Sequence, residues 1–149
     1  MLFRSESTVY AVVIAFIISN LVASLFYGIA ASGPVQELGM GRMLALSLGA
    51  GLYEELVFRV ILVGGLFHVF AALGGKRIAA YVGAALIGAA IFSAVHYIGA
   101  LGDPFEFSSF MFRFLFGLAL NGLYLARGFG VAAWTHALYD VMVVTSMLG

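Results

Sequence analysis

The chain has 149 residues, of which 64% are hydrophobic and only 9% are charged, with a mean hydropathy of +1.12. A soluble domain typically carries about 25% charged residues, so this composition excludes a water-soluble globular protein and indicates an integral membrane protein. Seven basic residues balance seven acidic ones without a basic patch, which argues against a nucleic-acid partner, and the absence of cysteine excludes disulfides and thiolate chemistry.

Five continuous apolar stretches follow one another along the chain, and each is predicted to be a transmembrane helix. They cover residues 9–31, 43–73, 78–101, 108–126 and 131–148. The first is longer than the roughly 7 to 15 apolar residues of a signal peptide, so we expect it to be retained. A membrane β-barrel would instead show alternation in segments of about 10 residues. The predicted fold is all-α, a polytopic membrane helix bundle of about five transmembrane helices.

Short polar connections between the stretches predict the topology. With five spans, the N-terminal lead and the turns at 74–77 and 127–130 lie on one side of the membrane. That side carries four basic residues, Arg4, Lys76, Arg77 and Arg127, and the other carries Arg42 and Arg113. The positive-inside rule then places the N-terminus in the cytoplasm. Arg113 lies near the start of its span, and we expect its side chain to snorkel to the interface.

The second stretch exceeds the roughly 20 residues that a span needs. It is either steeply tilted or broken near Gly64 and Gly65, and in the second case residues 66–73 form an interfacial piece. His68 falls in that piece, and we expect it to be an interface residue rather than a ligand.

Three charged residues, Glu54, Glu55 and Arg59, lie within the second stretch. Each charge at the centre of a bilayer costs roughly 2.5 to 3.5 kcal/mol on insertion scales, so they need partners. Glu55 and Arg59 are four residues apart and can pair on one helix face. Glu54 points about 100° away around the helix, which leaves it as the carboxylate that could exchange a proton with water.

Candidate partners lie in later stretches. His136 and Asp140 are again four residues apart, so the Asp could orient the imidazole or both could face a common ligand. His96 stands alone near the end of the third stretch, and a straight span would leave it roughly 9 to 12 Å from the midplane, away from Glu54. Two histidines and three carboxylates on three helices indicate a site.

Three classes of function fit such a site. In the first, Glu54 activates a water for hydrolysis while His96, His136 and Asp140 hold the water, a metal or an oxyanion. Zinc is one candidate metal, but the His-Glu-x-x-His signature is absent and a metal-free glutamate mechanism is equally allowed. In the second, the same groups relay protons or ions in a carrier. In the third, the protein is a membrane binding or immunity partner without chemistry.

Three motifs in this order, each in its own apolar stretch, resemble those of the CPBP intramembrane proteases, the relatives of the CAAX prenyl endopeptidase Rce1 (also the Abi family). The motifs are Glu54-Glu55-x-x-x-Arg59, Phe92-x-x-x-His96 and His136-x-x-x-Asp140. The resemblance divides the chain into an added N-terminal helix and loop, 1–42, and a protease-like core, 43–149.

The resemblance implies an intramembrane endopeptidase with its active site in a cavity within the bilayer. Glu54 and His96 would activate the water, Glu55 and Arg59 would support the site, and His136 and Asp140 would complete it and help to hold the oxyanion. The implied substrate is a membrane-anchored protein or peptide. The short core favours a prokaryotic member in the cytoplasmic membrane, processing sorting or anchor segments or bacteriocins. Asp140 replaces the Asn usual in eukaryotic members, so its role is either catalytic or limited to orienting His136.

Overall fold

A computed structural model of the protein describes residues 6–7, 9–10, 12–14, 16–17, 40–99 and 102–148. Within these ranges every regular element is a helix, which confirms the predicted all-α fold. The elements are α2 (Met40–Glu55), the π-helical segment η2 (Leu56–Val63), α3 (Gly64–Ala72), α4 (Arg77–Val95), α5 (Phe107–Arg127) and α6 (Phe129–Leu148).

Three helical stretches of the described chain are long and apolar enough to cross a membrane, namely Ser47–Ala72, Arg77–Val95 and Phe107–Arg127. They confirm an integral membrane protein. The helix α6 has 20 residues but carries His136, Asp140 and other polar side chains, and it is not among the three. The predicted first span, 9–31, lies largely outside the described residues, and its described parts are helical.

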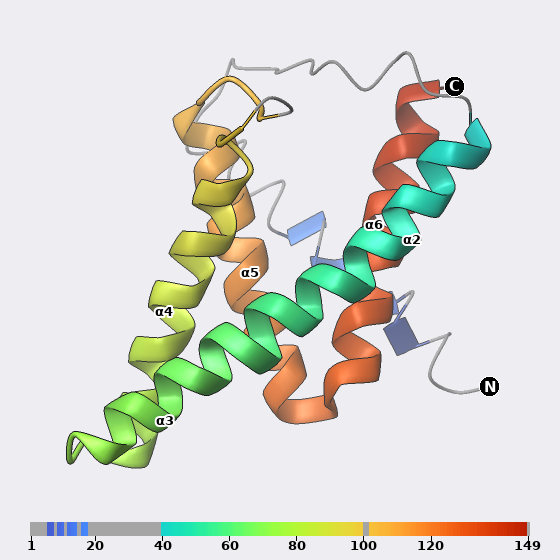
Figure 1. The fold of residues 1–149 in the computed structure, drawn as a ribbon. Helices are drawn as coiled ribbons and strands as arrows, with labels where there is room; N and C mark the ends of the chain where they lie inside the picture. Colours follow the sequence, from blue (N-terminus) through green and yellow to red (C-terminus); the bar gives the residue numbers. More distant parts are fainter. Residues whose placement is uncertain are drawn as a thin grey trace.

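The second predicted span is one continuous helical run from α2 through η2 to α3. Gly64 has φ −61° and ψ −46°, so the chain stays helical where a break was one alternative. The run crosses the other helices diagonally (Figure 1), in keeping with the tilted alternative. In η2 the amide of Gly64 donates to the carbonyl of Arg59, five residues back, and such wide turns occur frequently at functional sites.

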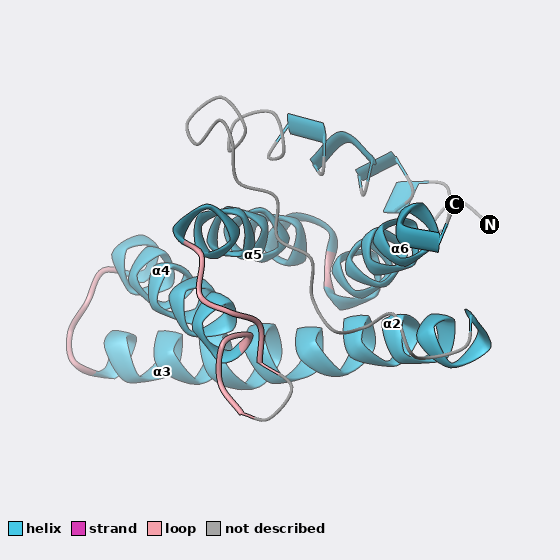
Figure 2. Ribbon diagram, turned by 90° about the horizontal axis from the view of Figure 1, so that it is seen from above, coloured by secondary structure: helices cyan, strands magenta, loops and turns pink. Residues whose placement is uncertain are grey.

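The helices pack in two layers. Seen from above, the α2–α3 run lies along one side and α4, α5 and α6 lie along the other (Figure 2). Small residues allow close approach where the layers cross. A Cβ built on Gly51 would lie 2.5 Å from the backbone nitrogen of Ala137, so α2 and α6 touch backbone to backbone there. On the far side of α5 and α6, Ile14 of the N-terminal region packs against Phe116 and Leu120.

The end of the third predicted span is wrong by six residues, because α4 ends at Val95 and not at residue 101. The chain turns there through Gly99, whose φ of +93° is a conformation that glycine adopts without strain. The amide of Asp103 then donates to the carbonyl of His96 at 2.9 Å. His96 therefore begins the turn that follows α4, and this turn brings Asp103 back to the His96 carbonyl.

Candidate active site

The six residues singled out from the sequence lie close together, although they come from three separate parts of the chain. Glu54 and Glu55 end α2, Arg59 lies in η2, His96 caps the C-terminus of α4, and His136 and Asp140 lie on α6. Ion-pair distances of 2.8 to 3.9 Å connect them into one cluster.

Glu55 forms the buried centre of this cluster, with 0% of its side chain exposed. Its Oε1 lies 3.0 Å from Arg59 Nη1, so the ion pair predicted from their spacing is present. The same oxygen lies 2.8 Å from His136 Nδ1, and because a carboxylate can only accept, the imidazole donates. Glu55, and not Asp140, therefore orients the His136 ring.

Arg59 is fully enclosed beside this carboxylate, with 1% of its side chain exposed. Its guanidinium lies over the Phe92 ring, 4.5 Å from the centroid, which is a cation–π contact. The guanidinium nitrogens make no hydrogen bond with another described residue, so charge attraction to Glu55 and the ring face hold it. Breaking this arrangement would leave a buried charge unpaired.

Glu54 faces both histidines. Its Oε2 lies 3.8 Å from His96 Nε2 and 3.9 Å from His136 Nε2, distances too long for direct hydrogen bonds. That oxygen is buried and has no hydrogen-bond partner among the described residues. A polar gap of this kind is one that a water can bridge.

His96 is held from its other side. Its Nδ1 lies 2.8 Å from the carbonyl oxygen of Phe92, which can only accept, so Nδ1 carries the proton and Nε2 is turned toward Glu54. The depth difference expected between His96 and Glu54 is thus not found. The run that contains α2 is diagonal (Figure 1), and Glu54, near the C-terminus of α2, lies 3.8 Å from His96, which caps α4.

Asp140 lies on the Glu54 side of His136. Its Oδ2 is 3.7 Å from His136 Nε2, and 28% of its side chain is exposed. Since Nδ1 of His136 is already bonded to Glu55, Asp140 lies beside the nitrogen that faces Glu54. The geometry therefore favours the alternative in which His136 and Asp140 face a common ligand.

Aromatic rings enclose the imidazoles. Phe92 makes edge contacts with both His96, at 5.0 Å between ring centroids, and His136, at 5.7 Å. Phe116 of α5 lies 5.6 Å from His136. Sequence reasoning gave Phe92 only as part of a motif and did not find Phe116, because an apolar ring inside an apolar span carries no distinguishing signal.

Sequence reasoning also missed polar contacts outside the cluster. Arg113, which we expected to snorkel to the interface, is bonded to Asp103 of the turn after α4 and to Ser109. Asn121 is buried on α5 and donates to the carbonyl of Ala85 at 3.1 Å, which joins α5 to α4. A lone polar residue within a span was the available signal for Asn121.

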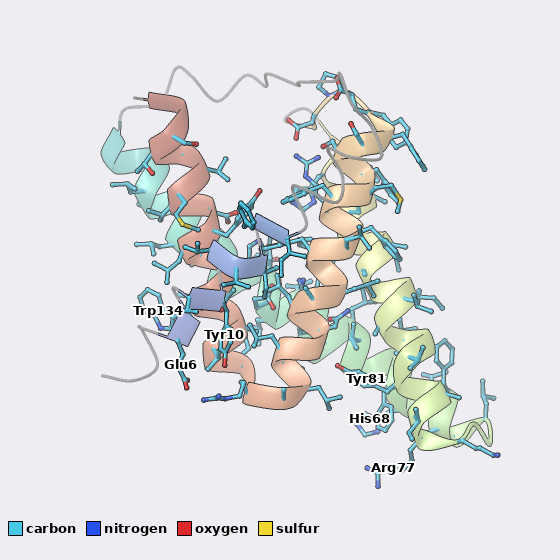
Figure 3. All side chains as sticks on the ribbon, turned by 180° about the vertical axis from the view of Figure 1, so that it is seen from behind. Glu6, Tyr10, His68, Arg77, Tyr81 and Trp134 are labelled. Carbon is cyan, nitrogen blue, oxygen red and sulfur yellow. The ribbon has the colours of Figure 1, made fainter. Side chains whose placement is uncertain are left out.

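His68 stays outside the cluster, as expected of an interface residue. Its side chain is exposed on α3. Figure 3 shows it at the same end of the molecule as Tyr81 and Arg77, well apart from the group formed by Glu6, Tyr10 and Trp134.

A bound metal was one alternative for this cluster. Within the described ranges no three His, Asp or Glu side chains are arranged so that they could hold a metal ion. The zinc alternative stays a prediction.

Comparison with family models matches residues 35–142, more than half of the chain, to the type II CAAX prenyl endopeptidase Rce1-like family. Comparisons with curated proteins and with solved structures gave no match. The matched range contains all six residues of the cluster. The chain therefore belongs to the Rce1-like family of type II CAAX prenyl endopeptidases, a family of proteases.

Proposed function

We propose that this protein hydrolyses a peptide bond of a membrane-associated substrate with a water activated by Glu54. The observation that carries the proposal is the shared orientation of the two histidines. His96 Nδ1 is bonded to the Phe92 carbonyl and His136 Nδ1 to Glu55, and each ring turns its Nε2 toward Glu54 Oε2, at 3.8 and 3.9 Å. Three polar atoms thus face one point from three helices, which is where a reacting water would lie.

The first step is attack by that water. The His96 Nε2 accepts one water proton as a hydrogen bond while the Glu54 carboxylate takes the other proton, so the water oxygen can form a bond to the carbonyl carbon. Glu54 then delivers its proton to the amide nitrogen as the carbon–nitrogen bond breaks. The products are a carboxylic acid and an amine, and all atoms of the water are accounted for.

His136 is proposed to stabilise the oxyanion that forms on the substrate carbonyl. Its Nδ1 proton is committed to Glu55, so it can donate to an oxyanion only when Nε2 is also protonated. Three carboxyl groups lie within 3.9 Å of this imidazole and only that of Glu55 pairs with a guanidinium, so a positive charge on the ring would balance them better than a neutral ring. Asp140, at 3.7 Å, would hold the Nε2–H toward the centre.

The membrane setting and the family point to the substrate. A protease built of apolar helices meets chains that are anchored in or at the bilayer. Cleavage of a prenylated CAAX end is the activity that the family's description names. Removal of sorting or anchor segments, or of bacteriocin leaders, fits the same site. We further propose a prokaryotic cytoplasmic membrane with the N-terminus in the cytoplasm, following the charge distribution of the turns.

A cleavage assay tests the proposal. The purified protein, in lipid nanodiscs, is given a panel of internally quenched peptides, one with a farnesylated CAAX end and others with membrane-anchor segments. Wild type is compared with Glu54→Gln and His96→Ala at equal concentrations. Glu6→Gln is the matched control, because this carboxylate pairs with the exposed Arg127, outside the cluster. We expect cleavage by wild type and Glu6→Gln only.

Full cleavage by Glu54→Gln would overturn the role of Glu54 as the general base. Absence of cleavage in every protein, together with retained biological function of Glu54→Gln in cells, would favour a non-proteolytic binding partner.

A further inference from the structure

Outside the motif residues, Arg113 is the centre of a second polar group beside the candidate site. One guanidinium nitrogen is bonded to the carboxylate of Asp103, and another donates to Ser109 Oγ at 2.9 Å. The guanidinium also lies 5.1 Å from the centroid of the Tyr97 ring. Both members of the ion pair are only partly exposed, at 23% and 32% of their side chains.

Two of the three partners of Arg113, Asp103 and Tyr97, belong to the segment that follows α4. We call it the post-α4 segment, and its described residues are 96–99 and 102–106. His96 opens this segment. Its ψ of −14° departs from the helical value, and the next two amides bond three residues back, Tyr97 to Ala94 at 3.1 Å and Ile98 to Val95 at 3.2 Å. The α-helix thus does not continue beyond His96, and contacts made further along the chain add to the Phe92 bond that orients its ring.

Two connections run from Arg113 to His96. In the first, Arg113 holds the side chain of Asp103, whose amide donates to the His96 carbonyl at 2.9 Å. In the second, the guanidinium covers the ring of Tyr97, the residue next to His96. Each connection reaches the histidine from a different part of the post-α4 segment.

We propose that Arg113 is a positioning residue for His96, acting through Asp103 and Tyr97 to keep His96 Nε2 turned toward Glu54. The proposal rests on the proposed function, because the orientation of His96 affects turnover only if His96 holds the attacking water. A planar guanidinium suits this task better than an ammonium, since it can bond two oxygens and cover a ring together.

A first experiment needs no substrate. The chain has three histidines, so the ring signals in a spectrum of histidine-labelled protein can be assigned with one substitution each. We expect Arg113→Gln to shift the His96 signals and to leave those of His68 in place. Arg127→Gln is the matched control, because it removes a second paired arginine from the same helix, at the end that Glu6 contacts. His96 signals in Arg113→Gln that superimpose on wild type would overturn the proposal.

A second experiment measures turnover of whichever quenched panel peptide the wild type cleaves fastest. A misplaced catalytic group can cost about a hundredfold, so we expect kcat to fall roughly tenfold to a hundredfold in Arg113→Gln, with KM within about twofold of wild type. Asp103→Asn should change kcat in the same direction, Arg113→Lys should recover part of the loss, and Arg127→Gln should match wild type.

The outcomes separate the two proposals. An inactive Glu54→Gln beside an Arg113→Gln variant with full kcat would overturn the positioning role alone. A raised KM with unchanged kcat would also overturn it, because Arg113 would then contact substrate. A fully active Glu54→Gln would overturn the proposed function instead, and the histidine spectra would still report on Arg113. If Arg113→Gln fails to fold, the kcat values of Arg113→Lys and Asp103→Asn test the positioning role, and wild-type kcat in both would overturn it.

Discussion

Glu55 Oε1 and His136 Nδ1 lie 2.8 Å apart, although 81 positions of sequence separate the two residues. Their hydrogen bond is buried where α2 crosses α6, one turn of α2 beyond the backbone contact of Gly51 with Ala137. Because the same oxygen also pairs with Arg59, one carboxylate links a local helix contact to a long-range one. Glu55 Oε1 is therefore expected both to stabilise the fold and to orient a residue of the candidate site.

Adjacent glutamates should respond differently to the same substitution. Glu55→Gln leaves Arg59 buried without a counter-charge, and breaking a buried pair costs about 3 to 5 kcal/mol, so we expect a lower melting temperature as well as lost cleavage. Glu54→Gln removes a charge from a partly exposed position and should abolish cleavage at an unchanged melting temperature. Thermal unfolding in nanodiscs measures both, and equal melting temperatures for the two variants would contradict this division.

The crossing of α2 and α6 should not tolerate a methyl group. In Gly51→Ala the new Cβ would meet the backbone of Ala137 at 2.5 Å, so the helices must separate and the contacts of Glu55 must lengthen. We expect loss of cleavage and a lower melting temperature. Gly49→Ala is the matched control on the same helix, because a methyl group at that position would have no neighbouring atom within 4 Å. The idea fails if both variants cleave equally well.

Replacing the aromatic ring of Phe92 should lower kcat even when the new side chain is also apolar. Its ring contacts the guanidinium of Arg59 and the rings of His96 and His136. Phe92→Leu keeps an apolar side chain but removes these face and edge contacts, so we expect kcat to fall. Phe67→Leu, which alters a ring packed near Tyr81, should leave kcat unchanged. Equal kcat values for Phe92→Leu and wild type would show that the ring contributes only apolar packing.

Asn121 is expected to stabilise the bundle without taking part in cleavage. Its bond to the Ala85 carbonyl joins α5 to α4, and hydrogen bonds between membrane helices average about 0.6 kcal/mol, up to about 1.7. Asn121→Leu should thus lower the melting temperature modestly and retain activity. An inactive variant with the wild-type melting temperature would instead assign Asn121 to the site.

The helical class, the membrane setting and the Glu55–Arg59 pair follow from the sequence, because apolar run length and i, i+4 spacing are local properties. The angle at which helices cross is not local, and no spacing reports it. The depth mismatch expected for His96 arose from treating each span as upright, whereas α2 runs diagonally and α4 ends at Val95.

Other features of the site are non-local in the same way. The spacing of His136 and Asp140 allowed Asp140 as the orienting group, but Glu55 takes that position from another helix. The bond between Arg113 and Asp103 depends on how the chain folds back after His96, which no periodicity reports. The π-helical turn of η2 could not be predicted from the sequence either, since residues 56–63 are as apolar as an ordinary membrane helix.

The two contacts of Glu55 differ in when they can form as the chain is made. Synthesis runs from the N-terminus, so α2 and η2 exist before α6 does. The pairing of Glu55 with Arg59 lies within one helical run, and it allows that run to enter the bilayer with these two charges already balanced. His136 reaches the same oxygen only after α6 has docked. The nascent chain would thus carry the Glu55–Arg59 pair first, and the six-residue cluster would be complete only once α6 has docked.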